Sequence, residues 1–237
     1  MTPPDLLHRV FAQIKRALPK PISDEIRSVA TALATPVIFS WRSGHFRSSF
    51  RRAAVDVSGH PTPWYTYPAI EFLRNRSFQG RRILEFGGGH STLWWASRAQ
   101  EVVTFDDNGE WLAELRQRVP DNVRLELVSS SGPEACVSDV EAALERLGAR
   151  TFDLVVVDGL WRGQLAPTAL RVVAPDGAIM VDNSDGYETQ ERYRGSGLNR
   201  VDFYGYAPGV VMPHCSSLFF AHGSFLLSCA QPIVRPE

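Results

Sequence analysis

From residue 61 onward, short apolar runs alternate with apolar residues at helical spacing. Apolar stretches at 83–84, 102–105 and 178–181, and a near-continuous one at 152–157, are typical of strands buried on both faces, and 123–128 is a further strand. Segments 93–98 and 165–173 fit helices, as does the spacing of Val140, Leu144 and Leu147. Pro175-Asp176-Gly177 predicts a turn. This alternation predicts an α/β, doubly wound, mostly parallel sheet with helices on both faces. Two last strands, 201–206 and 217–221, have no helix between them.

The N-terminal segment has a different pattern. The polar, proline-containing stretch 56–63 marks a boundary, so we expect an N-terminal helical segment over 1–60 and a Rossmann-like domain over 61–237. The segment is short and basic, which predicts a lid or a dimerisation arm. Apolar residues recur in it at helical spacing, and they predict a helix that packs on the domain or on a second subunit in a homodimer. These residues are Leu6, Leu7, Val10, Phe11 and Ile14.

Composition narrows the class of protein. The 237 residues, 44% of them hydrophobic, suffice for one α/β domain with an appendage. A net charge of −1, with no basic groove, disfavours nucleic acid as a partner. The chain shows neither a signal peptide nor an apolar run long enough to cross a bilayer, which predicts a soluble cytoplasmic protein. The three cysteines, Cys136, Cys215 and Cys229, have no metal-ligand spacing and are expected to be reduced thiols.

A glycine cluster follows the first strand of the domain. Gly87, Gly88 and Gly89 permit a tight turn that a ligand can approach closely, and Ser91 or Thr92 is expected to cap a helix that begins near Leu93. The next strand ends in Asp106 and Asp107, where a mononucleotide-binding βαβ unit places the acid that holds a ribose diol. The order of turn, helix, strand and acid therefore predicts a nucleotide-cofactor site. Thr92 stands where a dinucleotide fingerprint requires a glycine, which disfavours NAD.

Over residues 61–222 the chain resembles the class I S-adenosylmethionine-dependent methyltransferases, whose first motif is an acid followed by Gly-x-Gly, as in Glu85, Gly87 and Gly89. The resemblance implies a seven-stranded sheet that ends in an antiparallel pair. It also implies that the glycine turn lies against the methionine part of the cofactor and that Asp106 binds the ribose hydroxyls. Ser91 replaces the third glycine of the family motif.

An aromatic segment lies just upstream of the first strand. In the resembled family this region commonly covers cofactor or substrate, which makes Tyr65 and Thr66 candidate cofactor contacts. The alternative is a packed helix that leads into the domain.

Polar side chains follow the two middle strands. Asp158 ends one strand, and Asp182 and Asn183 end the next, so they should meet at the carboxyl edge of the sheet. The trio resembles the metal site of magnesium-dependent catechol-type O-methyltransferases, which implies Mg²⁺ bound to acceptor oxygens. The alternative is that Asp158 orients substrate or cofactor while Asp182 and Asn183 cap the following turn.

A metal-free reaction at oxygen requires a general base. The candidates are Asp158 and three histidines, and among the histidines His45 is favoured for its polar surroundings, over His90 and His214. Arg162 follows Asp158 by four residues and can pair with it or with an anionic substrate.

The predicted function is S-adenosylmethionine-dependent methylation of a small hydroxylated molecule, most simply at oxygen. Two alternatives stay open. A polyamine-type aminopropyltransferase shares the three glycines but normally has an acid directly after them, where this chain has His90. A non-catalytic cofactor-binding protein would keep the glycine turn without needing the acids at the strand ends.

Overall fold

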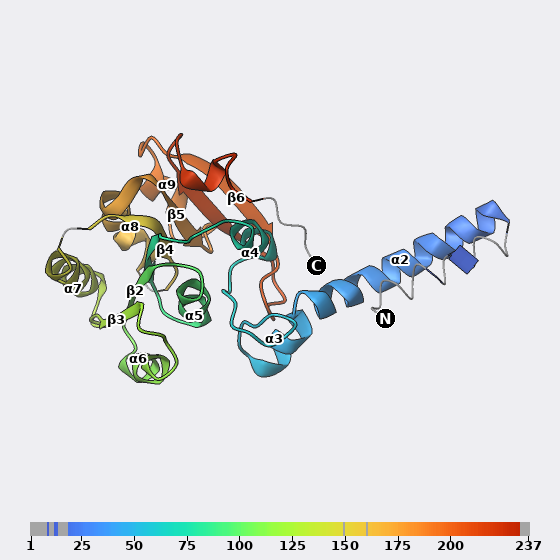
Figure 1. The fold of residues 1–237 in the computed structure, drawn as a ribbon, viewed down its shortest axis with the longest axis horizontal. Helices are drawn as coiled ribbons and strands as arrows, with labels where there is room; N and C mark the ends of the chain where they lie inside the picture. The colour runs from blue at the N-terminus through green and yellow to red at the C-terminus, as the bar shows by residue number, and fades with distance from the viewer. Residues whose placement is uncertain (1–8, 10–11, 14–18, 149, 160, 233–237) are drawn as a thin grey trace.

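The fold is known from a computed structural model that describes residues 9, 12–13, 19–148, 150–159 and 161–232. The apolar positions expected to form a helix over residues 6–14 lie outside this range. Figure 1 shows a layered α/β domain from which one long helix extends. Within the described residues, no helix combines the length and the apolar character that crossing a bilayer demands.

A single seven-stranded sheet organises the domain, in the order β3-β2-β1-β4-β5-β7-β6. Its first five strands pair in parallel, and β7 runs antiparallel to both β5 and β6. This confirms the predicted α/β architecture with an antiparallel C-terminal pair. The strands are β1 (Arg82–Phe86), β2 (Glu101–Asp106), β3 (Val123–Leu127), β4 (Phe152–Val157), β5 (Val173–Asp182), β6 (Asn199–Gly205) and β7 (His214–Phe220).

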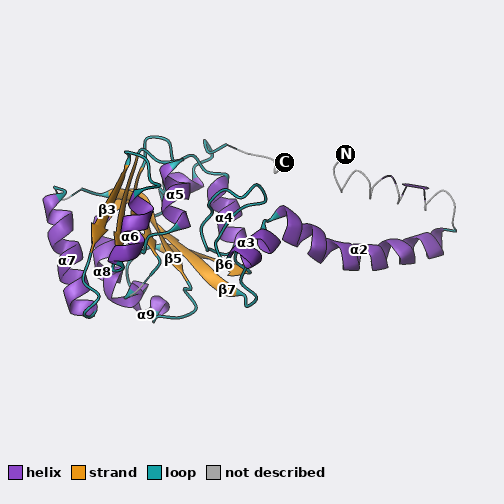
Figure 2. Cartoon of the chain, turned by 90° about the horizontal axis from the view of Figure 1, so that it is seen from below, coloured by secondary structure: helices purple, strands orange, loops and turns teal. Residues whose placement is uncertain are grey.

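Helices cover both faces of the sheet (Figure 2). One face packs against α4 (Tyr67–Arg74) and α5 (His90–Ala96), and the other against α7 (Pro133–Arg146), α8 (Arg162–Val172) and α9 (Thr189–Tyr193). Strand β4 is apolar throughout its buried positions because it lies between these two cores. Helix α6 (Gly109–Arg116) lies beside β3, and a 3₁₀ turn, η1 (Phe225–Leu227), follows β7.

Among its described residues, the N-terminal segment contains α2 (Lys20–Arg42) and α3 (His45–Arg51), with Gly44 between them. Gly44 has φ +77° and lies so close to the chain that a Cβ would be 2.4 Å from the carbonyl carbon of Asp56. Ser48 Oγ donates to Val55 O at 2.9 Å and accepts from Val55 N at 3.1 Å. Helix α3 is therefore fixed to the stretch of chain that leads into the domain, whereas α2 projects outward (Figure 1).

Local boundaries differ from the sequence predictions in three places. Helix α5 begins at His90, not near Leu93, and Gly89 takes the N-cap position expected for Ser91 or Thr92. Helix α8 begins at Arg162, so Pro167 lies inside it and not in its first turn. The segment 175–177 belongs to β5 as an irregularity in its pairing with β4, because Val173 already pairs with Phe152.

Candidate active site

Two adjoining cavities open at the carboxyl edge of the parallel strands, where open α/β sheets bind ligands. Their volumes are about 580 Å³ and 280 Å³, close to the range of small-molecule sites. Gly87, Asp106 and Gly159 line both cavities. One elongated ligand lying across this shared wall would reach both spaces.

Gly87 is required by the packing of the β1 and β4 ends. Its φ is +102°, and a Cβ on it would lie 1.6 Å from the carbonyl oxygen of Asp158. Gly89 is different, because its backbone is extended and a Cβ would meet only Ser91 Oγ, at 3.9 Å. The protein itself therefore makes no demand for glycine at 89. Bare backbone there faces the larger cavity, as a ligand-binding turn requires.

Glu85 lies behind the glycine turn and is fully buried. Thr92 Oγ1 donates to its Oε2 at 2.5 Å and Thr104 Oγ1 donates to the same oxygen at 3.0 Å. Burial raises the pKa of Glu85 to about 7, and the hydroxyl donors oppose that rise. Thr92 also accepts from Gly89 N at 3.0 Å, so the acid and the threonine hold the turn in place.

Asp106 ends β2 and points at the glycine turn. Its Oδ2 accepts from Gly88 N at 2.8 Å, and its Oδ1 accepts from Asn108 N at 2.9 Å. Each carboxylate oxygen still has a lone pair for a ligand hydroxyl. Burial raises the pKa of Asp106, while the two backbone donors lower it. Trp111 Nε1 donates to Gly88 O at 2.8 Å and adds an aromatic wall to the larger cavity.

His90 connects the turn to the N-terminal segment. Its Nδ1 lies 2.6 Å from Ala54 O, which accepts the proton of that nitrogen, and Arg118 Nη2 lies 3.2 Å from Nε2. These contacts favour the neutral Nδ1–H tautomer, in which Nε2 accepts from the guanidinium. Arg52 and Ala54 line the larger cavity, so the N-terminal segment forms part of its wall.

The strand-end trio is held by an arginine. Arg162 Nη2 donates to Asp158 Oδ1 at 2.7 Å, and Nη1 donates to Asn183 Oδ1 at 2.7 Å and to Asp182 O at 3.1 Å. The Arg162 side chain is 10% exposed. Burial and the neighbouring Asp182 raise the pKa of Asp158 to about 7, against the lowering effect of Arg162.

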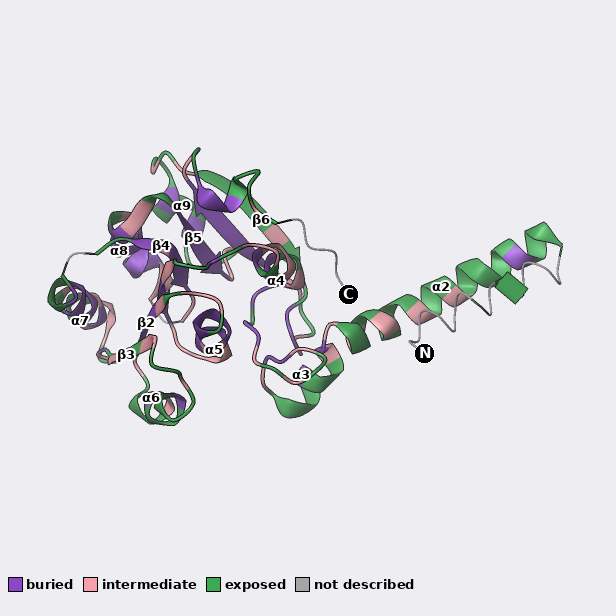
Figure 3. Ribbon diagram, viewed as in Figure 1, coloured by how far each residue is buried: buried purple, intermediate pink, exposed green. Residues whose placement is uncertain are grey.

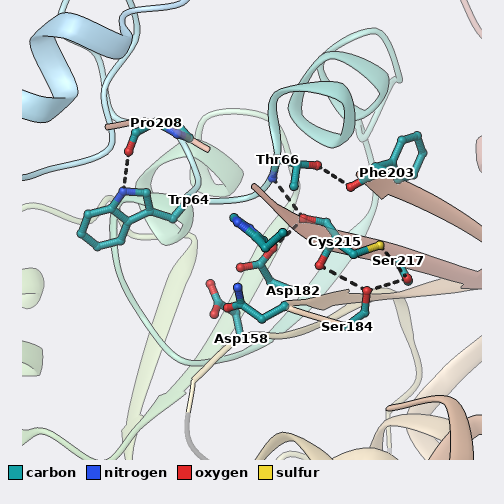
Figure 4. Close-up of polar contacts among 12 residues, drawn as sticks. Trp64, Thr66, Asp158, Asp182, Ser184, Phe203, Pro208, Cys215 and Ser217 are labelled. Carbon is teal, nitrogen blue, oxygen red and sulfur yellow. Dashed lines mark hydrogen bonds and ion pairs between the residues drawn. The ribbon is translucent and has the colours of Figure 1, made fainter. Parts of the chain in front are cut away.

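Asp182 is 3% exposed and takes part in a second network (Figure 4). Ser216 Oγ donates to Asp182 Oδ1 at 2.6 Å and accepts from Thr66 N at 3.0 Å. His214 Nε2 lies 3.4 Å from the same carboxylate oxygen, which raises the pKa of His214. Figure 4 shows the side chains of Asp158 and Asp182 next to each other, with the indole of Trp64 on the side toward the N-terminal segment.

The trio does not fit a magnesium site. Asp158 Oδ1 and Asn183 Oδ1, two of the oxygens that would have to converge on a cation, both accept from Arg162. Asp182 directs its carboxylate to Ser216 and His214. Across the ranges that the structure describes, no three His, Cys, Asp or Glu side chains form a group able to hold a metal ion. The guanidinium supplies the positive charge that the resemblance assigned to Mg²⁺.

Most of the predicted cofactor residues line the cavities, and the others lie behind them. Cavity-lining residues are Gly87, Gly88, Gly89, Ser91, Asp106 and Asp107. Tyr65, Thr66, Glu85 and Thr92 are fully buried and line neither cavity. Tyr65 instead accepts from Trp95 Nε1 at 3.2 Å in the core, and Thr66 binds β6 and β7.

His45 lies outside both cavities, at the start of α3. Its Nδ1 is 3.3 Å from Gly209 N and 3.4 Å from the hydroxyl of Tyr67. Trp64 Nε1 donates to Pro208 O at 2.8 Å nearby. The structure therefore places His45 away from both cavities, where its contacts help to hold α3 against the loop between β6 and β7. The polar character of its surroundings reflects this packing.

Several cavity residues were not predicted from the sequence. Trp64, Trp111 and Arg118 line the larger cavity, and Cys136 and Trp161 line the smaller one. The signal that could have found Trp111 is its place in the first turn of the helix after Asp106, close to the predicted ribose site. The remaining four come from loops and helices whose approach depends on the tertiary fold.

Comparison with known proteins places residues 84–184 in a family described as a methyltransferase domain. The matched stretch begins in β1 and ends just beyond β5, so it contains the glycine turn, Asp106 and the strand-end trio. No curated protein matches the sequence.

Solved structures similar to this chain include the following three, each with low sequence identity and a TM-score below 0.5. A methyltransferase-like protein from Silicibacter pomeroyi DSS-3 is 19% identical over 68% of this chain and 89% of that one, with a TM-score of 0.48. The N-methyltransferase NodS from Bradyrhizobium japonicum WM9, in complex with S-adenosyl-L-homocysteine, is 16% identical over 64% and 84%, with a TM-score of 0.44. A TehB-like methyltransferase from Corynebacterium glutamicum is 16% identical over 76% and 97%, with a TM-score of 0.47.

The sheet order, the glycine turn and the acid at the end of β2 are the features by which Rossmann-like domains bind nucleotide cofactors. The match over residues 84–184 adds that this part of the chain is similar to a methyltransferase domain. Among the alternatives left by the sequence, this match favours methyl transfer.

Proposed function

We propose that this protein transfers a methyl group from S-adenosylmethionine to a hydroxyl of a small molecule, without a metal ion, and that Asp158 is the general base. The observation that carries the proposal is the position of Asp158. Asp158 lines the larger cavity together with the glycines of the turn, and one of its carboxylate oxygens is held by Arg162.

The two cavities support a pose for the cofactor. The bare backbone of Gly88 and Gly89 suits the methionine end in the larger cavity, and Asp106 on the shared wall suits the ribose hydroxyls. The smaller cavity is lined by apolar side chains such as Val128 and Val140, which suit the flat faces of an adenine ring. When bound, the cofactor supplies an electrophilic methyl group on a sulfonium.

The protein residues would act on the acceptor. Arg162 holds Asp158 Oδ1, which leaves Oδ2 to accept the proton of an acceptor hydroxyl. A pKa of about 7 lets the carboxylate act as a base near neutral pH, since the deprotonated form is then well populated. Activity should accordingly rise with pH through this value.

The volume of the larger cavity limits the acceptor. About 580 Å³ must accommodate part of the cofactor together with the acceptor, so the acceptor is a small molecule. Trp64 and Trp111 at the walls favour a ring or another flat apolar group that carries the hydroxyl.

The test measures transfer of a labelled methyl group to panels of small phenols and sugars, and to amines and thiols for comparison, in the presence of EDTA. We expect transfer to a hydroxylated acceptor, and a loss of about 10²–10⁴-fold in kcat for Asp158→Asn. Asp121→Asn, an exposed substitution, is the matched control. Transfer only to amines or thiols, or an absolute need for Mg²⁺, would refute the proposal.

Binding of S-adenosylhomocysteine tests the cofactor pose separately. Asp106→Ala should lose roughly 1.5–3 kcal/mol of binding free energy, the range for hydrogen bonds to a charged group. Isothermal titration calorimetry that finds wild-type affinity in this variant would remove Asp106 from the ribose site.

A further inference from the structure

One segment of the chain carries basic residues without any acidic ones. Residues 26–55 contain five arginines and no aspartate or glutamate, although the whole chain has a formal net charge of −1. This segment includes most of α2, all of α3 and the first residues of the loop that leads into the domain. The arginines are Arg27, Arg42, Arg47, Arg51 and Arg52.

The same segment exposes a stripe of apolar side chains. Positions 22, 26, 29, 33, 37 and 41 follow one another at intervals of three or four residues, which places them along one side of α2. Their exposed fractions run from 37% at Ile26 to 71% at Leu33. Figure 3 shows α2 exposed along nearly its whole length. We call Ile22, Ile26, Val29, Leu33, Val37 and Trp41 the α2 stripe.

Further large apolar side chains are exposed where α2 meets the domain. Phe50 on α3 is 87% exposed, and Val211 and Met212 in the loop between β6 and β7 are 81% and 69% exposed. Gly209 brings that loop against α3, since a Cβ on it would lie 2.8 Å from Ser49 N. Exposed apolar surface of this extent marks an interaction site in a soluble domain.

The chemistry of the segment selects the partner. A helix that lies in a membrane interface combines an apolar side with basic residues and an aromatic side chain such as Trp41. Anionic lipid headgroups complement the five arginines. A second copy of α2 is less suited, because parallel pairing would bring like charges together and the acids of α2, Asp24 and Glu25, both lie near its start.

We propose that α2 and α3 bind the surface of an anionic lipid bilayer, with the α2 stripe in the interface and the arginines against the headgroups. The helix lies on the membrane and does not cross it. This inference does not depend on the acceptor or on the identity of the base. Arg52 also lines the larger cavity, so the lipid-binding segment is continuous with the wall of the active site.

The test is sedimentation of the full chain with two kinds of vesicle. One contains phosphatidylcholine alone, and the other also contains about 30% phosphatidylserine, which makes its surface anionic. We expect binding to the anionic vesicles, weakened by at least about tenfold on neutral vesicles, and weakened similarly by raised salt.

Two pairs of substitutions test the two parts of the surface. Leu33→Glu with Val37→Glu should abolish binding through the stripe, and Arg47→Gln with Arg51→Gln should remove the preference for anionic vesicles. Leu127→Glu, at a 60%-exposed site on β3, is the matched control and should bind as the wild type does. Circular dichroism of each variant establishes that it is folded.

Three results would overturn the proposal. The first is that the wild type stays in solution with anionic vesicles. The second is that the Leu33 and Val37 substitutions leave vesicle binding unchanged. The third is that light scattering shows a dimer that the same substitutions dissociate, which would make a second copy of the chain the partner of the α2 stripe.

Discussion

The guanidinium of Arg162 donates to Asp158 Oδ1 at 2.7 Å across a single turn of chain at the end of β4. This pair engages one of the carboxylate oxygens that a metal at the strand ends would need, and it orients the side chain of a residue that lines the larger cavity. A cation beside Asp158 also favours its ionised form.

Replacement of Arg162 by methionine should raise the pKa of Asp158, because the neighbouring positive charge is lost. The rise of activity with pH would then move to higher pH, and stability should fall by about 3–5 kcal/mol, as when a buried ion pair loses one partner. Arg162→Lys should retain the charge and most of the wild-type pH profile. A pH profile unchanged in Arg162→Met would show that the arginine does not act on Asp158.

Two glycines of the turn should respond differently to a methyl group. Gly87→Ala forces a Cβ against the carbonyl of Asp158 at a positive φ, so we expect a loss of stability of about 1–3 kcal/mol or more. In Gly89→Ala the new Cβ meets no protein atom closer than 3.9 Å, so this variant should unfold at the wild-type temperature. It should nevertheless bind S-adenosylhomocysteine at least about tenfold more weakly, because the methyl group occupies space in the ligand cavity. Equal effects of the two substitutions on thermal unfolding would contradict this assignment.

Glu85 should make folding stability depend on pH. Its pKa is about 7 in the folded protein and near its ordinary value of 4.5 when unfolded, so the folded state binds the extra proton between these values. The free energy of unfolding should therefore decrease, by about 3 kcal/mol, as pH rises from 4.5 to 7. The contribution is fully present below pH 4.5 and lost above pH 7.

Glu85→Gln should remove that part of the pH dependence, because a neutral amide still accepts from Thr92 and Thr104 but does not titrate. Thermal unfolding at pH 5, 6, 7 and 8 measures the effect, with the exposed Glu110→Gln as control. A Glu85→Gln protein that loses stability over this range as the wild type does would place the titration elsewhere.

Two truncations of the N-terminal segment should affect cofactor binding differently. Removal of residues 1–43 takes away α2 but leaves α3 and the cavity wall, so binding of S-adenosylhomocysteine should stay within about tenfold of wild type. Removal of residues 1–60 also takes away Ala54, which binds His90, and should weaken cofactor binding further. Identical affinity in both truncated proteins would mean that the segment contributes nothing to the cofactor site.

The strands and the cofactor turn could be predicted because they depend on local pattern. Buried parallel strands must be apolar on both faces, and the segment 152–157 coincides with β4. The spacing from Gly87 to Asp106 is set by one helix and one strand, and the structure joins the two ends through the Gly88 N–Asp106 Oδ2 hydrogen bond. Helix starts were less well predicted. Helix α5 begins at His90, because Gly89 and not Ser91 or Thr92 takes the N-cap position.

Catalytic roles could not be assigned in the same way. The composition around His45 suggested chemistry, yet its contacts with Tyr67 and Gly209 come from segments distant in the sequence. The spacing of Arg162 after Asp158 suggested an ion pair, and the structure confirms that contact. What the spacing could not show is that the same guanidinium also donates to Asn183 Oδ1, and so engages two of the oxygens that a metal at the strand ends would need.

By itself, then, the sequence determined the α/β architecture, the glycine turn and the acid that faces it, because each follows from backbone geometry and burial over short stretches of chain. Only the tertiary structure decided which polar groups meet at the strand ends, where Arg162 pairs with Asp158 and binds Asn183, and which aromatic side chains line the cavities. Side-chain partners brought together by folding depend on how the helices approach the sheet, and that approach is set by the packing of the whole core.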